Sequence, residues 1–262
     1  MPELPDVEVF RRRVARTALH RPIERVTVSD DLVVRGVGRQ TLRRRLRGTT
    51  LTSTRRHGKN VFVATDAGVH LHLHFGMTGY VDPLGPEDPA PPHLRVRLDF
   101  SDGGRLAFVD QRRLGTVGLV EDVDAWIEQH ELGPDALSLD LPTLRQLLAG
   151  WRGGLVGALM SQEAIAGIGN IYSDEILFHA RLAPRRRADD LTPAETARLH
   201  RQLGRVLSRA IEAGAQPERM PRGWLIQDRR DGAECPRGRG VVRRYRAGGR
   251  TGYWCPVCQG GD

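Results

Sequence analysis

The pattern of apolar and polar positions changes along the chain and predicts two different halves. Near the start, four apolar residues recur at helical spacing: Val7, Phe10, Val14 and Ala18. This spacing predicts a first helix over roughly residues 4–20. Apolar and polar residues then alternate strictly over residues 70–75 and 94–100, as they do in half-buried strands. A glycine turn at 102–104 and a Pro-rich stretch at 83–92, expected to be an exposed loop, complete a predicted β-sandwich or barrel with a leading helix.

After about residue 121, helical spacing replaces strict alternation. Thr192 and Glu195 have the spacing of a capping box, with Pro193 at the first helical position. The apolar stripe that follows consists of Leu199, Leu203, Val206, Leu207 and Ala210. Gly214 is a suitable C-terminal stop, so a long amphipathic helix is predicted here. Residues 232–258 contain few apolar residues, several glycines and all three cysteines, a composition that suits a small hairpin tied by a metal or by DNA.

The charge balance indicates a polyanionic partner. The chain of 262 residues carries 40 basic and 32 acidic residues, a net charge of +8, and all but one of the basic residues are arginine. We expect nucleic acid as the partner, and a merely solvated basic surface is the alternative. No apolar run is long enough to span a membrane, and no apolar signal segment opens the chain. We therefore expect a cytoplasmic protein with no membrane partner.

The first residues and the single lysine have distinctive chemistry. The chain opens Met1-Pro2-Glu3, and Lys59 is its one lysine. Removal of Met1 would leave Pro2 as a free secondary amine next to a carboxylate. Because an α-amino group titrates near ~8, much of it is unprotonated at neutral pH and can attack an aldehyde-like carbon to form an iminium ion. Lysine, unlike arginine, is a compact charge that can lose its proton, so its single use favours a chemical role over chance retention.

Three loops have compositions that suit contact with DNA. Residues 110–115 place two arginines and an apolar tip after a strand, and Met77 stands between two glycines. Apolar or arginine wedges of this kind fill the gap that an extruded base leaves. In residues 167–172, two glycines precede Asn170, which is predicted to cap the next helix, whose N-terminal amides would attract a phosphate. Taken alone, the loops at 110–115 and 167–172 are more typical of plain turns.

Two clusters contain residues of the types that bind metals. One face of the strand at 70–75 carries three imidazoles: His70, His72 and His74. They could serve a metal-dependent enzyme, but a polar strand face is the simpler interpretation. The tail carries three thiols: Cys235, Cys255 and Cys258. A closed zinc site would need a fourth thiol where Gly238 stands, so a three-ligand zinc site and a metal-free hairpin are both open.

Six segments together resemble the Fpg/Nei family of DNA glycosylases, most closely its formamidopyrimidine-DNA glycosylase branch. They are MPELPDVE at the start, RRHGK at 55–59, HFGMTG at 74–79, DQRRLG at 110–115, GIGNIYSDEILFHARLAP at 167–184 and GGRTGYWCPVC at 248–258. The segments occur in the family's order and span nearly the whole chain. The first and fifth are highly specific, and the others are weak singly but strong jointly.

The resemblance implies an α+β fold in three parts. An N-terminal catalytic β-sandwich domain with a leading helix is expected over residues 1–121, a helix–two-turn–helix DNA-binding domain over 122–231, and a zinc-finger-like β-hairpin over 232–262. Damaged double-stranded DNA would be the partner, lying in a basic cleft between the first two domains, and the protein would be a monomer. Zinc, if bound, would be structural, and catalysis would need no cofactor.

The resemblance also implies a reaction and the residues that perform it. The protein would be a bifunctional DNA glycosylase and AP lyase of base excision repair, which removes oxidised or ring-opened bases and cleaves the strand by β,δ-elimination. Pro2 would attack C1′ of the damaged nucleotide, Glu3 would be the general acid/base, and Lys59 would assist beside the phosphates. The residues expected to contact DNA are His74, Arg113, Asn170 and Arg250. The residues expected to fill the void are Met77, Arg112 and Leu114. Glu175 matches a carboxylate near the active site. A catalytically silent protein that binds damaged DNA is the alternative.

Several positions depart from the family pattern. Asp6 stands where Glu is usual, Leu114 replaces a Phe that would stack better on the estranged base, and Val156 stands where close members often have Lys. The stretch between Ala210 and Cys235, which in the family holds the loop over a flipped 8-oxoguanine, is shorter than is typical. We therefore expect poor recognition of 8-oxoguanine, with formamidopyrimidine lesions, oxidised pyrimidines or abasic sites as more suitable substrates.

Overall fold

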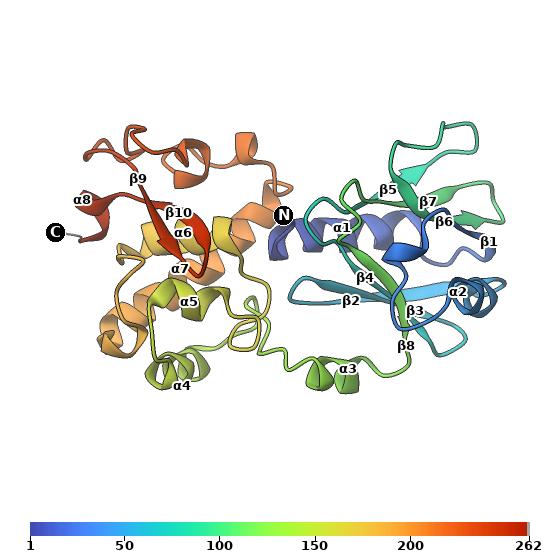
Figure 1. The fold of residues 1–262 in the computed structure, drawn as a ribbon, viewed down its shortest axis with the longest axis horizontal. Helices are drawn as coiled ribbons and strands as arrows, with labels where there is room; N and C mark the ends of the chain where they lie inside the picture. The colour runs from blue at the N-terminus through green and yellow to red at the C-terminus, as the bar shows by residue number, and fades with distance from the viewer. Residues whose placement is uncertain (261–262) are drawn as a thin grey trace. The chain divides into compact units, whose positions relative to one another are not determined.

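The computed structural model describes residues 1–260, and residues 261–262, the end of the expected hairpin domain, lie outside the described residues. The chain divides into two compact units. Unit 1 comprises Met1–Pro2 and Asp6–His130, and unit 2 comprises Glu3–Pro5 and Glu131–Asp262. Unit 1 contains two sheets with helices, and unit 2 is a helical body that carries a small hairpin (Figure 1). The predicted α+β fold is therefore confirmed.

Unit 1 is a sandwich of two antiparallel four-stranded sheets, with strand orders β1-β6-β7-β5 and β2-β3-β4-β8. The strands are β1 (Ile23–Val28), β2 (Leu51–His57), β3 (Asn60–Thr65), β4 (His70–His74), β5 (Tyr80–Leu84), β6 (Leu94–Phe100), β7 (Arg105–Val109) and β8 (Thr116–Val120). The helices are α1 (Leu4–Thr17), the 3-10 turn η1 (Asp31–Val33), α2 (Arg39–Leu46) and α3 (Val123–Gln129). Alternate residues of both sheets share one core, as in Val63 and Leu71 from one sheet and Val96 and Leu98 from the other.

The first helix ends at Thr17, slightly before the predicted end at residue 20, and His20 adopts a left-handed conformation with φ +62°. The Pro-rich loop is also shorter than predicted, because Pro83 and Leu84 belong to strand β5. Pro83 pairs with Leu106 there. Proline is tolerated in β5 because this is an edge strand, with a neighbouring strand on one side only.

The histidine face of β4 is covered rather than open. The ring of His72 lies 5.1 Å from the ring of Phe62 and 4.6 Å from that of Trp126 in α3. Its Nε2 lies 3.0 Å from Oδ1 of Asn60. Burial, followed by the nearby His74 and His130, lowers the pKa of His72 to about 3, so this ring is neutral at pH 7. The simple polar strand face expected from the sequence is therefore wrong at its centre, because α3 packs over it.

Helix α3 is part of unit 1 by its packing. Trp126 makes an edge-to-face contact with Phe62 at 5.2 Å, in a small cluster that also holds Val120 and Val123. Asp122 caps the helix by accepting hydrogen bonds from the amides of residues 124 and 125. The domain boundaries after residues 121 and 231 stay predictions.

An ion-pair cluster fastens α1 to strand β2. The carboxylate of Glu8 lies 2.8 Å from both Arg11 and Arg12 and 3.3 Å from Arg56, whose side chain is almost fully buried. Burial alone would raise the pKa of Glu8, but the hydrogen bonds from Arg11 and Arg12 outweigh it and lower the pKa to about 2.

Because its pKa is lowered in the folded state, Glu8 is expected to make the free energy of unfolding depend on pH. A lowered folded-state pKa stabilises the fold above the unfolded pKa of 4.5, and this contribution is lost as pH falls toward 2. Replacement of Glu8 by Gln should cost about 2 kcal/mol at pH 7, allowing for partial exposure, and flatten the loss of stability below pH 4.5. Urea denaturation from pH 3 to 7 measures this. The Glu24→Gln variant, which changes an exposed acid, is the control. If Glu8→Gln and the parent protein lose the same free energy of unfolding between pH 7 and pH 3, Glu8 is not the source of the pH dependence.

Unit 2 is built on helices packed around α6. Its helices are α4 (Leu141–Gly150), α5 (Leu155–Met160), α6 (Asn170–Ala180), α7 (Pro193–Glu212) and α8 (Pro256–Gln259). The 3-10 turns are η2 (Ala188–Asp190), η3 (Pro217–Arg219) and η4 (Leu225–Asp228), and the hairpin strands are β9 (Arg243–Ala247) and β10 (Arg250–Trp254). The predicted capping box of Thr192 and Glu195 is confirmed, and Gly214 follows the helix with φ +70°. No helix among the described residues is both long and apolar enough to cross a membrane.

Helix α6 is buried along most of its length, and it positions the other parts of unit 2. Its buried residues are Tyr172, Ser173, Asp174, Glu175, Ile176, Leu177, Phe178 and Ala180. Two adjacent carboxylates, Asp174 and Glu175, are therefore inside the unit, and neither has any exposed surface. Buried carboxylates require partners, and these partners determine the geometry of the candidate site.

Candidate functional site

The carboxylate of Glu3 occupies the N-terminus of α6. Glu3 is only 1% exposed. Its Oε2 accepts hydrogen bonds from the backbone N–H groups of Gly169 at 2.9 Å and Tyr172 at 3.1 Å, and its Oε1 accepts one from Ile171 at 2.8 Å. Orphan amides and the helix dipole both favour a negative charge at this point. The carboxylate next to Pro2 is thus held in one orientation by three backbone donors.

The two glycines before α6 make room for the N-terminal residues. A Cβ on Gly169 would lie 2.4 Å from Cδ of Glu3, and one on Gly167 would lie 2.5 Å from Cδ1 of Leu4. Gly167 also has φ +113°, a conformation that other residues rarely adopt. The amide of Leu4 donates to the carbonyl of Gly167 at 3.0 Å. The glycine pair therefore serves to receive residues 3–4, and not merely to turn the chain.

Asn170 does not cap α6, and this prediction is corrected. The N-cap residue is Gly169, with no side-chain cap, and Glu3 takes that place from far away in the sequence. The Nδ2 of Asn170 instead donates to the carbonyl of Thr251 in β10 at 2.8 Å. The amides expected to attract a phosphate at this helix are therefore occupied by a carboxylate.

In unit 1, Lys59 and His74 lie at the same end of neighbouring strands. Gly58 and Lys59 form the turn between β2 and β3, and Asn60, the next residue, pairs with His74. The Nδ1 of His74 accepts a hydrogen bond from the amide of Gly76 at 3.3 Å, so the proton of the neutral ring lies on Nε2. Burial, and then the positive charge of Lys59, lowers the pKa of His74. This ring is a neutral donor at pH 7.

Two loops of unit 1 are joined through the buried carboxylate of Asp110. Its Oδ1 accepts hydrogen bonds from the hydroxyl of Thr78 at 2.5 Å and the amide of Arg112 at 3.2 Å, and its Oδ2 accepts one from the amide of Gly115 at 2.7 Å. Gly76, with φ +55°, approaches so closely that a Cβ would lie 2.4 Å from the carbonyl carbon of Leu114. The loops at 76–79 and 110–115 therefore form one rigid assembly.

This assembly presents the three predicted void-filling residues. Met77 is 40% exposed and Leu114 is 48% exposed, and both belong to the small set of large apolar side chains that the described residues leave in solvent. Arg112 is exposed beside them. Arg113 adopts φ +57°, and its Nη1 lies 3.7 Å from Oδ2 of Asp30. Exposed apolar tips on a braced backbone are suited to insertion into a base stack.

In unit 2, Asp174 fastens the hairpin to α6. Its Oδ1 accepts from the hydroxyl of Tyr245 at 2.5 Å, and its Oδ2 accepts from the amide of Tyr253 at 2.8 Å and from Arg229 at 2.7 Å. Burial raises the pKa of Asp174 to about 6, although Arg229 and Tyr245 oppose that shift. The exposed Arg250 begins β10 on this anchored hairpin, and its Nη1 lies 3.9 Å from the sulfur of Met160.

Glu175 fixes the short segment after α7. Its two oxygens accept the amides of Leu225 at 3.0 Å and Ile226 at 2.7 Å, and its Oε1 lies 3.0 Å from Nε2 of His179. The role of Asp174 was not predicted from the sequence. The signal that could have found it is the pair of adjacent acids inside an otherwise apolar helical stretch, since such acids need buried partners.

The three cysteines converge, as the metal-site alternative requires. The sulfur atoms of Cys235, Cys255 and Cys258 all lie within 4.8 Å of one another, and this is the one cluster of metal-ligand side chains found in residues 1–260. Gly238 contributes no side chain and has φ +66°. Burial raises the pKa of the Cys255 thiol to about 12, so a metal would have to displace its proton. The imidazoles of His70, His72 and His74 do not form such a cluster, which argues against a metal site on β4.

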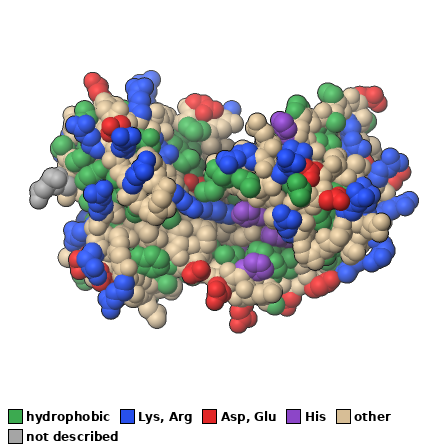
Figure 2. All heavy atoms as spheres, in the orientation of Figure 1, with side chains coloured by type: hydrophobic (Ala, Val, Ile, Leu, Met, Phe, Trp, Pro, Cys, Tyr) green, Lys and Arg blue, Asp and Glu red, His purple; other side chains and the backbone are tan. Residues whose placement is uncertain are grey.

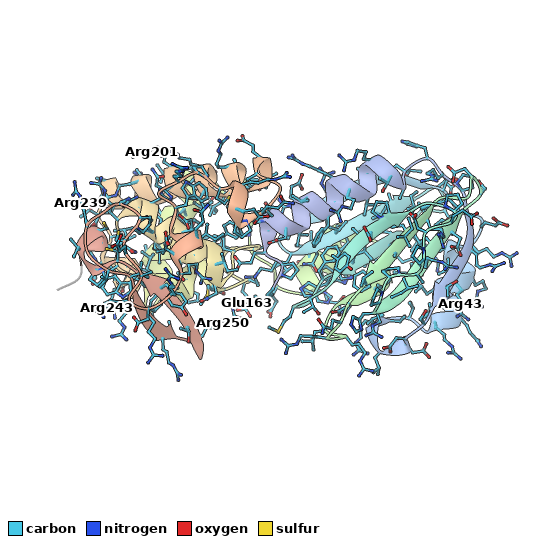
Figure 3. The ribbon with its side chains drawn as sticks, turned by 90° about the horizontal axis from the view of Figure 1, so that it is seen from above. Arg43, Glu163, Arg201, Arg239, Arg243 and Arg250 are labelled. Carbon is cyan, nitrogen blue, oxygen red and sulfur yellow. The ribbon has the colours of Figure 1, made fainter. Side chains whose placement is uncertain are left out.

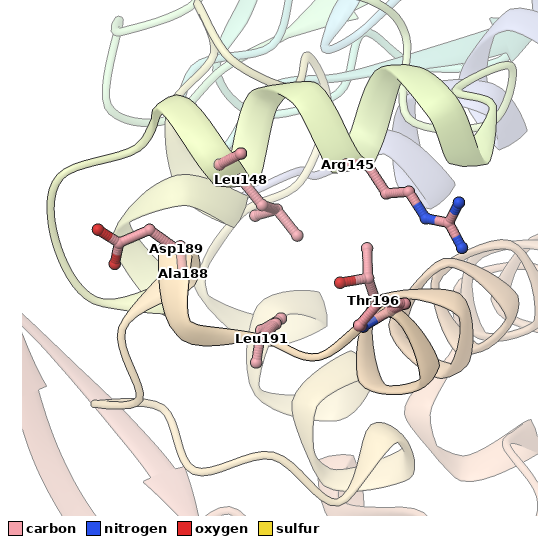
Figure 4. Close-up of a pocket in the computed structure, with 8 residues that line it drawn as sticks. Arg145, Leu148, Ala188, Asp189, Leu191 and Thr196 are labelled. Atoms are coloured by element: carbon pink, nitrogen blue, oxygen red, sulfur yellow. The ribbon is translucent and has the colours of Figure 1, made fainter.

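Basic side chains are spread over both units on the face that Figure 2 shows. A separate cavity lies against α4, where Leu148 and Arg145 face Leu191 and Thr196 (Figure 4). None of the predicted site residues lines this cavity, and Asp189 at its edge is paired with Arg187 at 2.6 Å. The cavity is therefore unrelated to the residues described above.

Comparison with known proteins gives the same family for both parts of the chain. Residues 1–117 match the model of the formamidopyrimidine-DNA glycosylase N-terminal domain, and residues 132–221 match that of the formamidopyrimidine-DNA glycosylase H2TH domain. The formamidopyrimidine-DNA glycosylases of Laribacter hongkongensis and Thermus thermophilus are each 36% identical to this chain, over 99% of it and 100% and 99% of their own lengths. The formamidopyrimidine-DNA glycosylase of Symbiobacterium thermophilum is 34% identical, over 99% of this chain and 89% of its own length.

Solved structures agree with this similarity. The Lactococcus lactis Fpg in complex with abasic-site DNA superimposes with a TM-score of 0.88 at 26% identity, over 98% of this chain and 99% of that one. The Lactococcus lactis Fpg (MutM) in complex with Fapy-dG DNA gives a TM-score of 0.89 at the same identity and coverage.

Proposed function

Since the chain belongs to the formamidopyrimidine-DNA glycosylase family, the DNA glycosylases of base excision repair, we propose that it is a bifunctional glycosylase and AP lyase with the amine of Pro2 as its nucleophile. The observation that carries the proposal is the carboxylate of Glu3, which follows Pro2 directly and is held by three backbone amides. A nucleophile beside a fixed acid/base group is the arrangement that covalent catalysis requires.

The chemistry follows from the amine that removal of Met1 exposes. The nitrogen of Pro2 forms a bond to C1′ of the damaged nucleotide while the bond from C1′ to the base breaks, and the departing base takes up a proton. Opening of the C1′–O4′ bond, with protonation of O4′, gives an iminium ion. The iminium acidifies the 2′ hydrogens, so loss of a proton breaks the C3′–O bond, and a second elimination breaks the C5′–O bond. Water then releases Pro2 by hydrolysis.

Glu3 and Lys59 are proposed to move protons and to hold phosphates in this sequence. A carboxylate fixed by three donors needs little reorganisation during the reaction, and so it can act as a preorganised general acid/base. Lys59 is the only lysine of the chain and stands on a tight turn between β2 and β3. Its compact charge suits a phosphate group beside the lesion.

The proposed DNA contacts use donors that the fold has already oriented. His74 offers Nε2–H because its Nδ1 accepts from Gly76. Arg250 and Asn170 belong to elements that are fastened together, since Asn170 donates to Thr251 in β10. Arg113 completes the proposed set from the loop at 110–115. Contacts of this kind position a duplex without reading its sequence.

Extrusion of the damaged base would leave a gap that Met77, Arg112 and Leu114 are proposed to fill. Unstacking a base costs a few kcal/mol, and wedges inserted from a rigid support recover part of it. The support here is Asp110, which joins both loops. Leu114 presents less surface for stacking than an aromatic residue would.

We propose abasic sites and ring-opened or oxidised bases other than 8-oxoguanine as the preferred lesions. The segment between α7 and the cysteines is tied down rather than extended over a pocket. Gln227 donates to the carbonyls of Pro217 at 2.9 Å and Met220 at 3.2 Å, and Glu175 holds the amides of residues 225–226. A segment held in this way cannot close over a flipped base without losing those hydrogen bonds.

A panel of duplexes tests the function and the lesion preference together. Protein that lacks Met1 should nick an abasic-site duplex and release the base from a Fapy-dG duplex, with an undamaged duplex as the control. Excision of 8-oxoguanine should be at least ~10-fold slower than abasic-site cleavage in single-turnover conditions, because poor pocket contacts reduce transition-state binding. No nicking of any lesion would refute the enzyme proposal, and comparable rates on 8-oxoguanine and abasic sites would refute the preference alone.

We also propose zinc as the metal for the three cysteines. Cys235, Cys255 and Cys258 would hold it, and its contribution would be structural, linking the segment 235–240 to the end of β10. Residues 1–260 supply no fourth side chain, so the remaining position would be open to water. Metal analysis of the purified protein tests this: about one zinc per chain is expected for a site of this type, and metal-free protein with an intact hairpin would contradict it.

A further inference from the structure

Unit 2 carries a basic groove that none of the proposed catalytic and DNA-contacting residues enters. It begins at a cavity lined by α7 and the end of α6, and an adjoining cavity shares Arg181 and Arg237 with it. The arginines along the two cavities are Arg181, Arg198, Arg201, Arg205, Arg237 and Arg239. We call this set the arginine groove.

The arginine groove lacks the carboxylates that pair arginines elsewhere in unit 2. Arg187 lies 2.6 Å from Asp189, and Arg209 lies 2.8 Å from Glu212. Within residues 1–260, no ion pair joins any arginine of the groove to a carboxylate. Two acids lie close to the groove. Glu175 lies behind His179, is fully buried and already accepts two backbone amides. Glu195 interacts electrostatically with Arg198, but it is paired with Arg186 at 3.2 Å. The six arginines of the groove therefore carry more positive charge than the nearby acids neutralise.

The groove is also organised. Arg198 donates to the carbonyl of Ala180 at 2.7 Å, and Arg237 donates to that of Phe178 at 3.0 Å, with its guanidinium 4.1 Å from the centre of the Phe178 ring. These contacts hold two guanidinium groups in place and leave other N–H groups available. Arg201 and Arg205 lie four residues apart on one exposed face of α7, where like charges repel each other in the absence of an anion.

The arginine groove is separated from the proposed DNA contacts of the same unit. In Figure 3, Arg201 lies on one side of unit 2, whereas Arg243 and Arg250 of the hairpin lie on the opposite side, with Arg239 at the end. A duplex in contact with Arg250 would therefore leave Arg201 in solvent. The groove needs another ligand, and its two joined cavities suit a chain of phosphates better than a single small anion.

We propose that the arginine groove binds the phosphate backbone of a second DNA segment, so that one protein molecule can hold two duplexes. The inference relies on the function proposed above only for the choice of DNA as the polyanion. Guanidinium groups bind phosphates through paired N–H donors, and such contacts require no particular base sequence. A protein with this second site would stay attached to a neighbouring DNA segment while its catalytic residues engage a lesion.

A bridging experiment tests the proposal. A duplex with a reduced, uncleavable abasic site is fixed to beads and saturated with protein, and a fluorescent undamaged duplex is then added at low salt. The parent protein should capture the fluorescent duplex. The double variant R201Q/R205Q should still bind the fixed duplex but capture at least ~10-fold less of the second one, because two phosphate contacts are lost. R187Q/R209Q, which removes the same charge from two exposed, paired arginines of unit 2, should capture within about twofold of the parent.

The outcomes separate this proposal from the enzymatic one. Equal capture by R201Q/R205Q and the parent, or no capture by the parent, would overturn the second site. Sedimentation of each variant excludes bridging by dimers. Stabilisation of the parent by inorganic phosphate without capture of DNA would make the groove a small-anion site, and would also overturn the proposal. Abasic-site nicking is measured in parallel: capture without nicking would reject the enzyme proposal alone, and nicking without capture would reject the second site alone.

Discussion

Replacement of Glu3 by Gln is expected to reduce base excision by at least ~100-fold, within the range that general acid–base catalysis supplies. The structure makes this change more disruptive than its size suggests. Both carboxylate oxygens of Glu3 accept backbone amides, Oε1 from Ile171 and Oε2 from Gly169 and Tyr172. A glutamine has only one acceptor oxygen, so its NH2 group would face an N–H donor. The variant loses the negative charge and also the orientation of the side chain.

The same variant should be less stable by about 1–3 kcal/mol, the cost of leaving a buried donor unsatisfied. Single-turnover base release measures the catalytic effect, and urea denaturation measures the stability. Glu163→Gln, an exposed acid in the segment before α6, is the control and should change neither quantity. Affinity for an uncleavable abasic-site duplex should stay within a few-fold of the parent. Full excision by Glu3→Gln would remove Glu3 from the mechanism.

Loss of the secondary amine at residue 2 is expected to have a still larger effect. Acetylation of Pro2, or retention of Met1, should reduce both excision and strand cleavage by ~1000-fold or more, because a blocked nitrogen has no lone pair for attack on C1′. The Pro2→Gly variant should also excise bases and cleave the strand much more slowly. Its primary amine forms an imine that can lose its proton, whereas the iminium of a secondary amine is permanently charged. Affinity for an uncleavable duplex should change little, so the loss is expected in the rate of the chemical step. A blocked terminus that still supports the parent rate would contradict this prediction.

Much of the fold could be predicted from the sequence. The strict alternation over residues 94–100 and the capping box at Thr192 depend on local chemistry, and both are confirmed. The covered face of β4 could not be predicted in this way, because the tryptophan that packs over His72 is Trp126, which belongs to a helix much later in the chain. Whether another element packs over a strand face depends on the tertiary structure, and the local pattern of apolar and polar residues does not predict it.

The candidate site shows the same division. Local composition indicated the chemistry of Pro2 and the exposed tips at Met77 and Leu114, which the structure leaves in solvent. It assigned the cap of α6 to Asn170, whereas Glu3 takes that role across most of the chain length. It also did not reveal that Asp174 holds the hairpin through Tyr245. Both misses involve buried carboxylates, whose partners are set by the fold and not by neighbouring residues.

The composition of the chain makes the central claim unusually easy to test. Apart from the α-amine, the only primary amine of the chain is the side chain of Lys59. An iminium adduct with an abasic-site duplex can therefore form at two positions only. Lys59→Arg keeps the charge at that position and removes the second amine, so it serves as the matched control.

The decisive measurement is borohydride trapping on an abasic-site duplex, followed by peptide mass spectrometry of the adduct. We predict that the reduced sugar is attached to the nitrogen of Pro2, in protein that has lost Met1, and that Lys59→Arg still gives the adduct. Attachment to Lys59, or an undiminished yield from protein that retains Met1, would contradict the account.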